Sequence, residues 1–241
     1  MGSTLYPHIF SNHLLPVVHS SALPNISSEQ IWPSLLLISC LALLAIIKAG
    51  AFSRVLRIIQ STFSNQILQQ LEREEVNALK LHSLALSTFY IINLSFLLYK
   101  VNAMFGFVLR LEDSLVQFSF FFVLILLLFA AKFALLKLLA VFTDQYRLFA
   151  DYGTSTLLVN QTLGIFIFPL IALAEFTTVN PLWFVYIALS MLALSIALKW
   201  YRGLIMSLVE ERIGILQIFS YFCGLEILPI LSLAKFVVET L

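Results

Sequence analysis

The stretch Ile213–Leu241, IGILQIFSYFCGLEILPILSLAKFVVETL, decides how this chain is built. It is long enough to cross a bilayer, which takes about 20 predominantly apolar residues. It also carries Glu226 near its middle. A carboxyl group at that depth is costly unless it faces protein, water or a bound partner. The stretch therefore predicts a membrane span, and it raises the question of what Glu226 faces.

The rest of the chain has the composition of a membrane protein. Of its 241 residues, 61% are hydrophobic and only 11% are charged, whereas soluble domains are about 45–50% apolar and about 25% charged. The net charge is +1, so nothing indicates nucleic-acid binding. Cys40 and Cys223 lie inside apolar stretches and are interpreted as reduced packing residues rather than as a disulfide or metal pair.

Apolar segments of sufficient length recur along the chain and predict an all-α polytopic membrane protein with about six transmembrane helices. We expect residues 1–31 to form a tail outside the cytoplasm, and residues 32–241 to form a single transmembrane domain. The predicted spans cover residues 32–48, 81–99, 118–139, 156–173, 182–198 and 213–238.

The basic residues predict an orientation. The first connection between spans is rich in Lys and Arg, and the third and fifth also carry them, the fifth with Lys199, Arg202 and Arg212. The second holds only Lys100 and Arg110, and the fourth holds none. Lys and Arg are retained on the cytoplasmic side of a membrane. We therefore expect the first, third and fifth connections in the cytoplasm and both termini outside it.

The first connection predicts an amphipathic cytoplasmic segment over residues 52–80. Apolar side chains that include Phe52, Leu56, Ile59 and Phe63 recur every three or four residues, which places them on one stripe of a helix. Such a helix lies in the membrane interface or against other cytoplasmic helices. Residues 61–65 (STFSN) predict a break that divides it into two short helices.

An acidic cluster follows that segment, formed by Glu72, Glu74 and Glu75. Two interpretations stay open for it: a solvated helix face, or a docking surface for a partner protein.

Two further connections carry helix signals. The third predicts an amphipathic helix over residues 142–152, with Thr143 as its N-cap and Gly153 as its stop. In the fifth, Ser207 and Glu210 have the spacing of a capping box, which predicts that the last helix begins near Leu208.

Several polar residues fall at membrane depth. Glu226, Lys132, Asn160 and Asn93 form a candidate intramembrane cluster, with Lys132 as the partner of Glu226 by depth and Asn160 as a bridging amide. Its functional interpretation is an ion, proton or headgroup site. The structural alternative is a protonated Glu226 bonded to a backbone carbonyl that Pro229 leaves without its helical donor.

No sequence motif indicates catalysis. The chain contains no HExxH, no P-loop and no GxSxG, and no paired aspartates of the kind that hold magnesium on lipid-linked phosphates. We expect no cofactor and no metal site. The expected partners are membrane lipids and proteins at the cytoplasmic face, and an enzyme with an unfamiliar site is the least favoured alternative.

The end of the chain resembles a known family. Members of the family called domain of unknown function 4271 typically end with a Tyr-x-Cys-x-Leu-Glu-Ile-Leu-Pro run and a nearby Lys. This chain has a similar run, Tyr221-Phe222-Cys223-Gly224-Leu225-Glu226-Ile227-Leu228-Pro229, followed by Lys235. Further similar features are Asn160 with Leu163, Gly164 and Pro169, Tyr201-Arg202-Gly203, and Gln69-Gln70-Leu71 with Glu74-Glu75. The resemblance implies several spans in a bacterial inner membrane. It implies no activity.

Two functional hypotheses follow. In the first, the protein is a non-enzymatic subunit or scaffold of a membrane complex, in which Glu226 organises the bundle. In the second, it is a transporter or lipid-binding protein, and the layer around Glu226, Lys132, Asn160 and Asn93 lines a cavity. A dry bundle favours the first hypothesis, and a continuous polar cavity that reaches Glu226 favours the second.

Overall fold

The computed structural model is all-α, as predicted, and it describes residues 31–63, 81–106, 113–144, 146–177 and 180–209. Its helices run Ile31–Phe63 (α1), Leu81–Phe105 (α3), Ser114–Thr143 (α4), Tyr146–Phe176 (α5) and Leu182–Val209 (α6).

Each of these helices contains a segment long and apolar enough to cross a membrane. The segments are Ile31–Gly50, His82–Phe105, Ser114–Phe142, Phe149–Phe176 and Leu182–Ile205. They confirm a multi-pass membrane protein and correspond to the first five predicted spans. The sixth predicted span, residues 213–238, lies outside the described residues.

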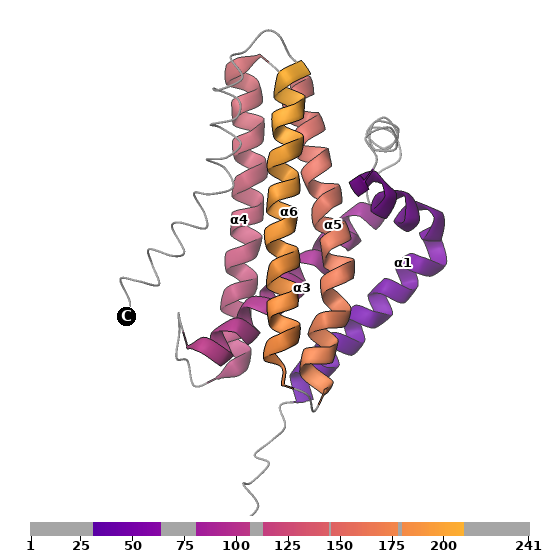
Figure 1. Ribbon diagram of the computed structural model, residues 1–241, viewed down its shortest axis with the longest axis vertical. Helices are drawn as coiled ribbons and strands as arrows, with labels where there is room; N and C mark the ends of the chain where they lie inside the picture. The colour runs from indigo at the N-terminus through magenta and orange to yellow at the C-terminus, as the bar shows by residue number, and fades with distance from the viewer. Residues whose placement is uncertain (1–30, 64–80, 107–112, 145, 178–179, 210–241) are drawn as a thin grey trace, which may run out of the picture.

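Helix α5 is the centre of the bundle, and it contacts every other described helix. Helices α4, α5 and α6 stand side by side, and α3 crosses behind them at an angle (Figure 1). Helix α1 lies beside α5 and bends sharply, so that its two ends approach the bundle at different levels (Figure 1). Helices α4 and α6 each pack on α5 but hardly touch each other.

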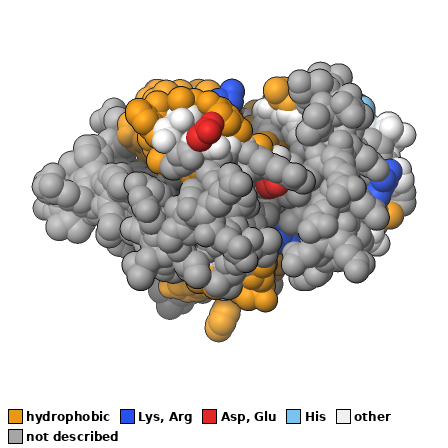
Figure 2. Space-filling model, turned by 90° about the horizontal axis from the view of Figure 1, so that it is seen from above, with side chains coloured by type: hydrophobic (Ala, Val, Ile, Leu, Met, Phe, Trp, Pro, Cys, Tyr) orange, Lys and Arg blue, Asp and Glu red, His pale blue; other side chains and the backbone are white. Residues whose placement is uncertain are grey.

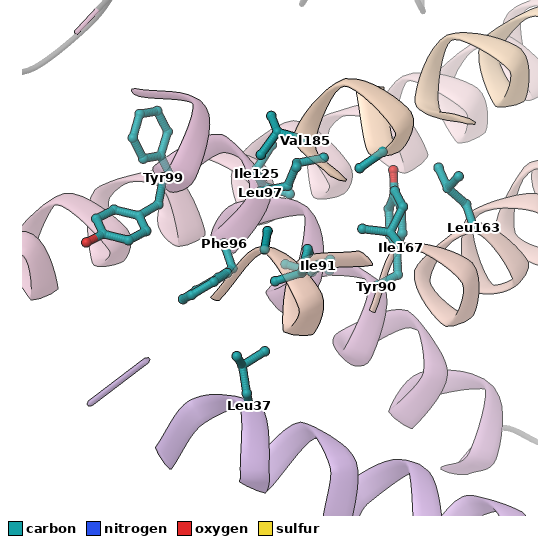
Figure 3. Close-up of a cluster of buried hydrophobic side chains, with 14 residues drawn as sticks. Leu37, Tyr90, Ile91, Phe96, Leu97, Tyr99, Ile125, Leu163, Ile167 and Val185 are labelled. Atoms are coloured by element: carbon teal, nitrogen blue, oxygen red, sulfur yellow. The ribbon is translucent and has the colours of Figure 1, made fainter. Parts of the chain in front are cut away.

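The main hydrophobic core brings side chains from all of these helices together, with Leu37 from α1, Phe96 from α3, Ile125 from α4, Ile167 from α5 and Val185 from α6 (Figure 3). Trp32 joins the start of α1 to this core. Its ring centroid lies 5.3 Å from that of Tyr99 and 5.4 Å from that of Phe118. The indole Nε1 donates a 3.0 Å hydrogen bond to Ser114 Oγ. Aromatic pairs of this kind add packing energy beyond area burial.

Helices α3 and α5 approach each other closely at Gly164. A Cβ atom placed there would lie 3.0 Å from both Cα and Cβ of Tyr90. Small residues at such crossings let two backbones approach, which is how helices associate where lipid offers no hydrophobic driving force.

The outer faces of the bundle are apolar. Leu127 and Val141 on α4 are 62% and 60% exposed, and large hydrophobic side chains on α1 and α6 are exposed as well. Seen from the end where α4 passes into α5, the described part shows mostly hydrophobic side chains, with charged ones in small separate patches (Figure 2). Such surfaces suit a lipid environment. Cys40 is buried and unbridged, as predicted.

The helix limits correct three sequence predictions. Thr143 is the last residue of α4 rather than an N-cap, because the chain turns at Asp144, which has a left-handed backbone with φ 55°. Gly153 does not stop a helix, since α5 continues through it. Ser207 lies inside α6, so no helix begins at Leu208. At Gly153 and Ser207 the helix continues in spite of the local capping signal, because such signals are only weak preferences that tertiary context overrides.

The amphipathic segment also differs from its prediction. Its first part, residues 52–63, is continuous with the first span in α1, and no break occurs at Ser61. The side of α1 that packs inward carries Ile58, Ser61 and Thr62, which are buried, whereas Leu56 on the predicted apolar stripe is 43% exposed. The rest of this segment, with the acidic cluster Glu72, Glu74 and Glu75, lies outside the described residues.

Candidate functional site

The most polar part of the described bundle lies where the end of α1 meets α5 and α6. Arg202 of α6 is buried there. Its Nη2 donates to the backbone carbonyls of Ser61 and Thr62, at 2.7 and 2.6 Å, and its Nη1 donates to Ser155 Oγ of α5 at 3.0 Å. One guanidinium group therefore links three helices.

The chemistry of a helix end explains why an arginine suits this place. The last four carbonyls of an α-helix have no intrahelical donor, and Ser61 and Thr62 belong to the last turn of α1. The partial negative charge at a helix C-terminus also favours a cation. The guanidinium offers several donors in a fixed plane, so it bonds two carbonyls and a hydroxyl at once.

Hydroxyl groups complete this junction. The hydroxyl oxygens of Thr62 on α1 and Thr162 on α5 are 3.0 Å apart. Both also lie 3.4 Å from the carbonyl of Ile58, and the Ser61 hydroxyl donates to that carbonyl at 2.6 Å. Hydroxyl bonds to a carbonyl within the same helix tend to bend it. The junction thus fixes the end of α1 against α5.

A second polar link joins α5 to α3. The side chain of Gln161 is fully buried, and its Nε2 donates to the Ser83 carbonyl at 3.0 Å, to Ser83 Oγ at 2.9 Å and to Ser87 Oγ at 3.1 Å. Within the described residues, Gln161 Oε1 has no hydrogen-bond partner.

Two more buried oxygens on α5 share that property. Neither Thr156 Oγ1 nor Asn160 Oδ1 has a hydrogen-bond partner in the described part of the chain. The two residues are four positions apart, so they lie one above the other on one face of α5. A buried polar atom without a partner is costly, so each of these atoms marks a place where the described residues supply no hydrogen-bond partner.

The structure places the predicted polar cluster as follows. Lys132 of α4 is half-buried, and its Nζ lies 6.0 Å from the ring centroid of Tyr152, which is two turns from Asn160 on α5. Asn93 is buried in α3 and donates from Nδ2 to its own Phe89 carbonyl at 2.8 Å. Glu226 lies outside the described residues, so the cluster as a whole stays a prediction.

Of the residues that match the family motif, some lie in the described helices and others do not. Arg202 forms the junction described above, and Pro169 lies on the exposed side of α5, which remains helical through it. Tyr221, Cys223 and Pro229 lie outside the described residues.

Sequence reasoning assigned Lys199 and Arg202 to a connection between spans, and this was wrong. Both lie in α6, and both are buried. The sequence also left Glu175 without a role, whereas its carboxylate forms an ion pair with Lys100 of α3. Lys100 Nζ lies 5.7 Å from the ring centroid of Phe96 as well. The sequence feature that could have predicted this ion pair is the position of Lys100 and Glu175, one base and one acid at matching depths near the same ends of two spans.

A recess lies beside that ion pair, between α3, α5 and α6. It is lined mainly by aliphatic and aromatic side chains, among them Leu97, Ile171, Phe184 and Val185, and it has no room for a water molecule. The described helices are therefore tightly packed at this place.

Comparison with known protein families gives a match over most of the chain. The family model described as domain of unknown function 4271 matches residues 34–237. No curated protein and no solved structure shows a significant match.

Proposed function

The chain belongs to the domain of unknown function 4271 family, and we propose that it is a non-enzymatic subunit or scaffold of a membrane complex. This proposal rests on one observation: buried polar side chains form hydrogen bonds between helices of the same chain. Arg202 and Gln161 bond neighbouring helices of the same chain, and the recess beside Lys100 has no room for water. These contacts hold a bundle together and leave its outer surface for interactions.

The end of α1 is the proposed docking surface. Its inner face is fixed to α5 and α6 through Thr62 and Arg202. The opposite side presents Leu56 together with Arg57 and Gln60, all exposed in the described structure. A rigid helix with an outward aliphatic side chain between polar ones suits the centre of a protein interface, because burial of an aliphatic group is favourable and fixing a rigid helix costs little entropy.

The test is purification of the tagged protein from its native membrane in mild detergent. We compare the wild type with Leu56→Gln, and we use Val141→Gln on α4 as the matched control because Val141 is also an exposed aliphatic residue near the same end of the bundle. The proposal requires a stoichiometric partner that Leu56→Gln loses and Val141→Gln keeps. A chain that purifies alone, well folded, in all three preparations overturns it.

The orientation is part of this proposal. We propose a bacterial inner-membrane location with both termini outside the cytoplasm, supported by the distribution of Lys and Arg and by the family resemblance. The docking surface at the end of α1 then faces the cytoplasm. Labelling of single cysteines by a membrane-impermeant thiol reagent tests this, with Gln60→Cys expected to react only after the membrane is opened.

A second function is favoured by a different observation. The buried oxygens of Thr156, Asn160 and Gln161 have no hydrogen-bond partner in the described residues, as expected if a ligand supplies the donors. In this alternative the protein is a transporter or lipid-binding protein with a polar site around Glu226. A melting temperature that rises on addition of lipid or cation to wild type, and not to Asn160→Leu, would support it.

A further inference from the structure

The charged side chains of α4, α5 and α6 lie towards the two ends of the bundle. At one end, Glu175 of α5 forms its ion pair with Lys100 of α3. Towards the other end, these three helices carry Lys132, Lys137, Arg147, Asp151, Lys199 and Arg202. The segments between, residues 114–131 of α4, 152–174 of α5 and 182–198 of α6, contain no charged residue. Ionisable groups are costly in hydrocarbon, so these segments mark the part of the bundle that lipid can surround.

Two contacts align the three helices along their length. Arg202 of α6 bonds Ser155 of α5, and Leu136 of α4 lies 3.8 Å from the position of a Cβ atom on Gly153 of α5. Because α4, α5 and α6 stand side by side (Figure 1), these residues lie near one level, the level of Arg202. Beyond that level each of the three helices continues for about 10 to 14 Å, and in Figure 1 their upper ends rise above α1.

Exposed aromatic side chains of α6 mark two boundaries. Trp183 and Tyr186 are exposed near the start of the helix, and Tyr201 is exposed directly before Arg202. Trp and Tyr are enriched at both membrane–water interfaces. Trp183 and Tyr201 lie about 27 Å apart along α6, which is close to the hydrocarbon thickness of about 30 Å. The spacing therefore suits one bilayer boundary at Trp183 and the other at Tyr201.

The hydrophobic clusters divide at the level of Arg202 as well. The side chains that α4, α5 and α6 contribute to the main core all lie on the Trp183 side of that level. A separate cluster lies at and beyond it, between α4 and α5, and consists of Leu136, Ala140, Phe149 and Tyr152. Lipid gives helices no hydrophobic driving force for association, whereas water does. A separate apolar core is therefore what these helix ends need where lipid does not surround them.

Helix length decides how much of the bundle lipid can cover. The apolar segment Ser114–Phe142 of α4 is about 43 Å long. Complete immersion in a hydrocarbon layer of about 30 Å would require a tilt of more than about 45°, whereas transmembrane helices tilt by at most about 40°. Part of this apolar segment must therefore extend beyond the hydrocarbon layer.

We infer that the bilayer surrounds the bundle from the level of Trp183 to that of Tyr201, and that the ends of α4, α5 and α6 beyond Arg202 stand outside the hydrocarbon. The lipid headgroups contact the two aromatic boundaries. Hydropathy alone would keep Val141 in lipid, but it lies about 12 Å beyond the Tyr201 boundary. This inference does not depend on the proposed function, because it concerns only the contact with lipid.

The first test measures the depth of two α4 side chains that the structure exposes almost equally, Leu127 at 62% and Val141 at 60%. In a Cys40→Ala, Cys223→Ala background, a nitroxide is attached to Leu127→Cys or to Val141→Cys in the full chain, reconstituted in lipid vesicles. Molecular oxygen concentrates in hydrocarbon and a nickel chelate stays in water. The ratio of the relaxation rates that they cause reports depth, even where another part of the chain covers the label.

We expect oxygen to dominate at Leu127→Cys and the nickel chelate to dominate at Val141→Cys. The same oxygen-dominated ratio at both positions overturns the inference, because α4 would then lie in hydrocarbon along its whole apolar length.

The second test uses the wild-type chain, so no substitution can disturb its fold. Its melting temperature is measured in vesicles of monounsaturated phosphatidylcholines of increasing chain length. We expect the highest value where the hydrocarbon layer is about 27 Å thick and a loss in thicker bilayers, because mismatch between protein and lipid is costly. A melting temperature that keeps rising to the thickest bilayer of the series contradicts the inferred boundaries.

Discussion

Arg202 and Thr62 lie 140 positions apart in the sequence, and a 2.6 Å hydrogen bond from the guanidinium Nη2 to the Thr62 carbonyl joins them. The bond ties the end of the first described helix to the last one. The same guanidinium also donates to the Ser61 carbonyl and to Ser155 Oγ, in a buried environment. The shape of α1 therefore depends on a residue near the other end of the described chain.

Replacement of Arg202 by Met should destabilise the protein substantially. It removes charge-assisted hydrogen bonds, each worth about 1.5–3 kcal/mol, and leaves the last carbonyls of α1 without their donor. Arg202→Lys should recover only part of the loss, because an ammonium group lacks the planar fork that reaches several acceptors. Thermal unfolding in nanodiscs measures both effects.

Ser155→Ala serves as a milder control for Arg202→Met and Arg202→Lys. It removes a single neutral acceptor and leaves both carbonyl bonds of Arg202 in place, so we expect a loss of about 1 kcal/mol. If Ser155→Ala proved as damaging as Arg202→Met, the carbonyl bonds would not be the main contribution.

Gly164→Ala should weaken the crossing of α3 and α5. The new Cβ would lie 3.0 Å from the Cα and Cβ atoms of Tyr90, which is closer than packed carbon atoms tolerate, so the helices must move apart. Overpacking typically costs about 1–3 kcal/mol. The melting temperature in nanodiscs reports the change.

Gly153→Ala on the same helix is the matched control for Gly164→Ala. Its Cβ would meet Leu136 and Phe133 at 3.8 Å, an ordinary contact, and alanine favours a helix over glycine by about 1 kcal/mol. We therefore expect Gly153→Ala to be neutral or stabilising. Equal losses at both glycines would contradict the close crossing at Tyr90.

Replacement of Gln161 by Met should cost a modest amount. It deletes the bonds to Ser83 and Ser87, and interhelical hydrogen bonds in membranes average only about 0.6 kcal/mol. The substitution also removes Gln161 Oε1, a buried oxygen that has no hydrogen-bond partner in the described residues. Its removal offsets part of the stability lost with the hydrogen bonds. A drop in stability as large as that of Arg202→Met would mean that Gln161 has a further partner.

The ion pair of Lys100 and Glu175 predicts a charge-exchange rescue. Lys100→Glu places two carboxylates together and should lower the melting temperature, whereas Lys100→Glu with Glu175→Lys should restore most of it. The pair is partly buried, so added salt should screen the interaction only weakly. Failure of the exchanged pair to recover stability would show that the contact contributes little.

The sequence was sufficient to predict the described spans, because hydropathy over about 20 residues is a strong and local signal. It failed at the helix limits. Thr143, Gly153 and Ser207 have the right chemistry for caps, yet α5 runs through Gly153 and α6 runs through Ser207. At Asp144 the chain turns within a very short connection. Local propensity decides only where packing does not.

Hydropathy does not encode the contacts between neighbouring helices, so the sequence did not predict them. Arg202 was assigned to a connection because basic residues usually end a span, and only the fold brings the end of α1 to it. The pairing of Lys100 with Glu175 likewise needs the two helix ends to be neighbours. Depth along a helix can be counted from the sequence, whereas the direction in which a side chain points depends on how the helices are packed.

The central claim is that this protein acts as a subunit of a membrane complex. The most direct test is the mass of the assembly released from native membranes in polymer-bounded nanodiscs, without detergent. The account predicts a species in which the 27.3 kDa chain is accompanied by a different protein in a fixed ratio. A mass made only of whole multiples of this chain and bound lipid would contradict it.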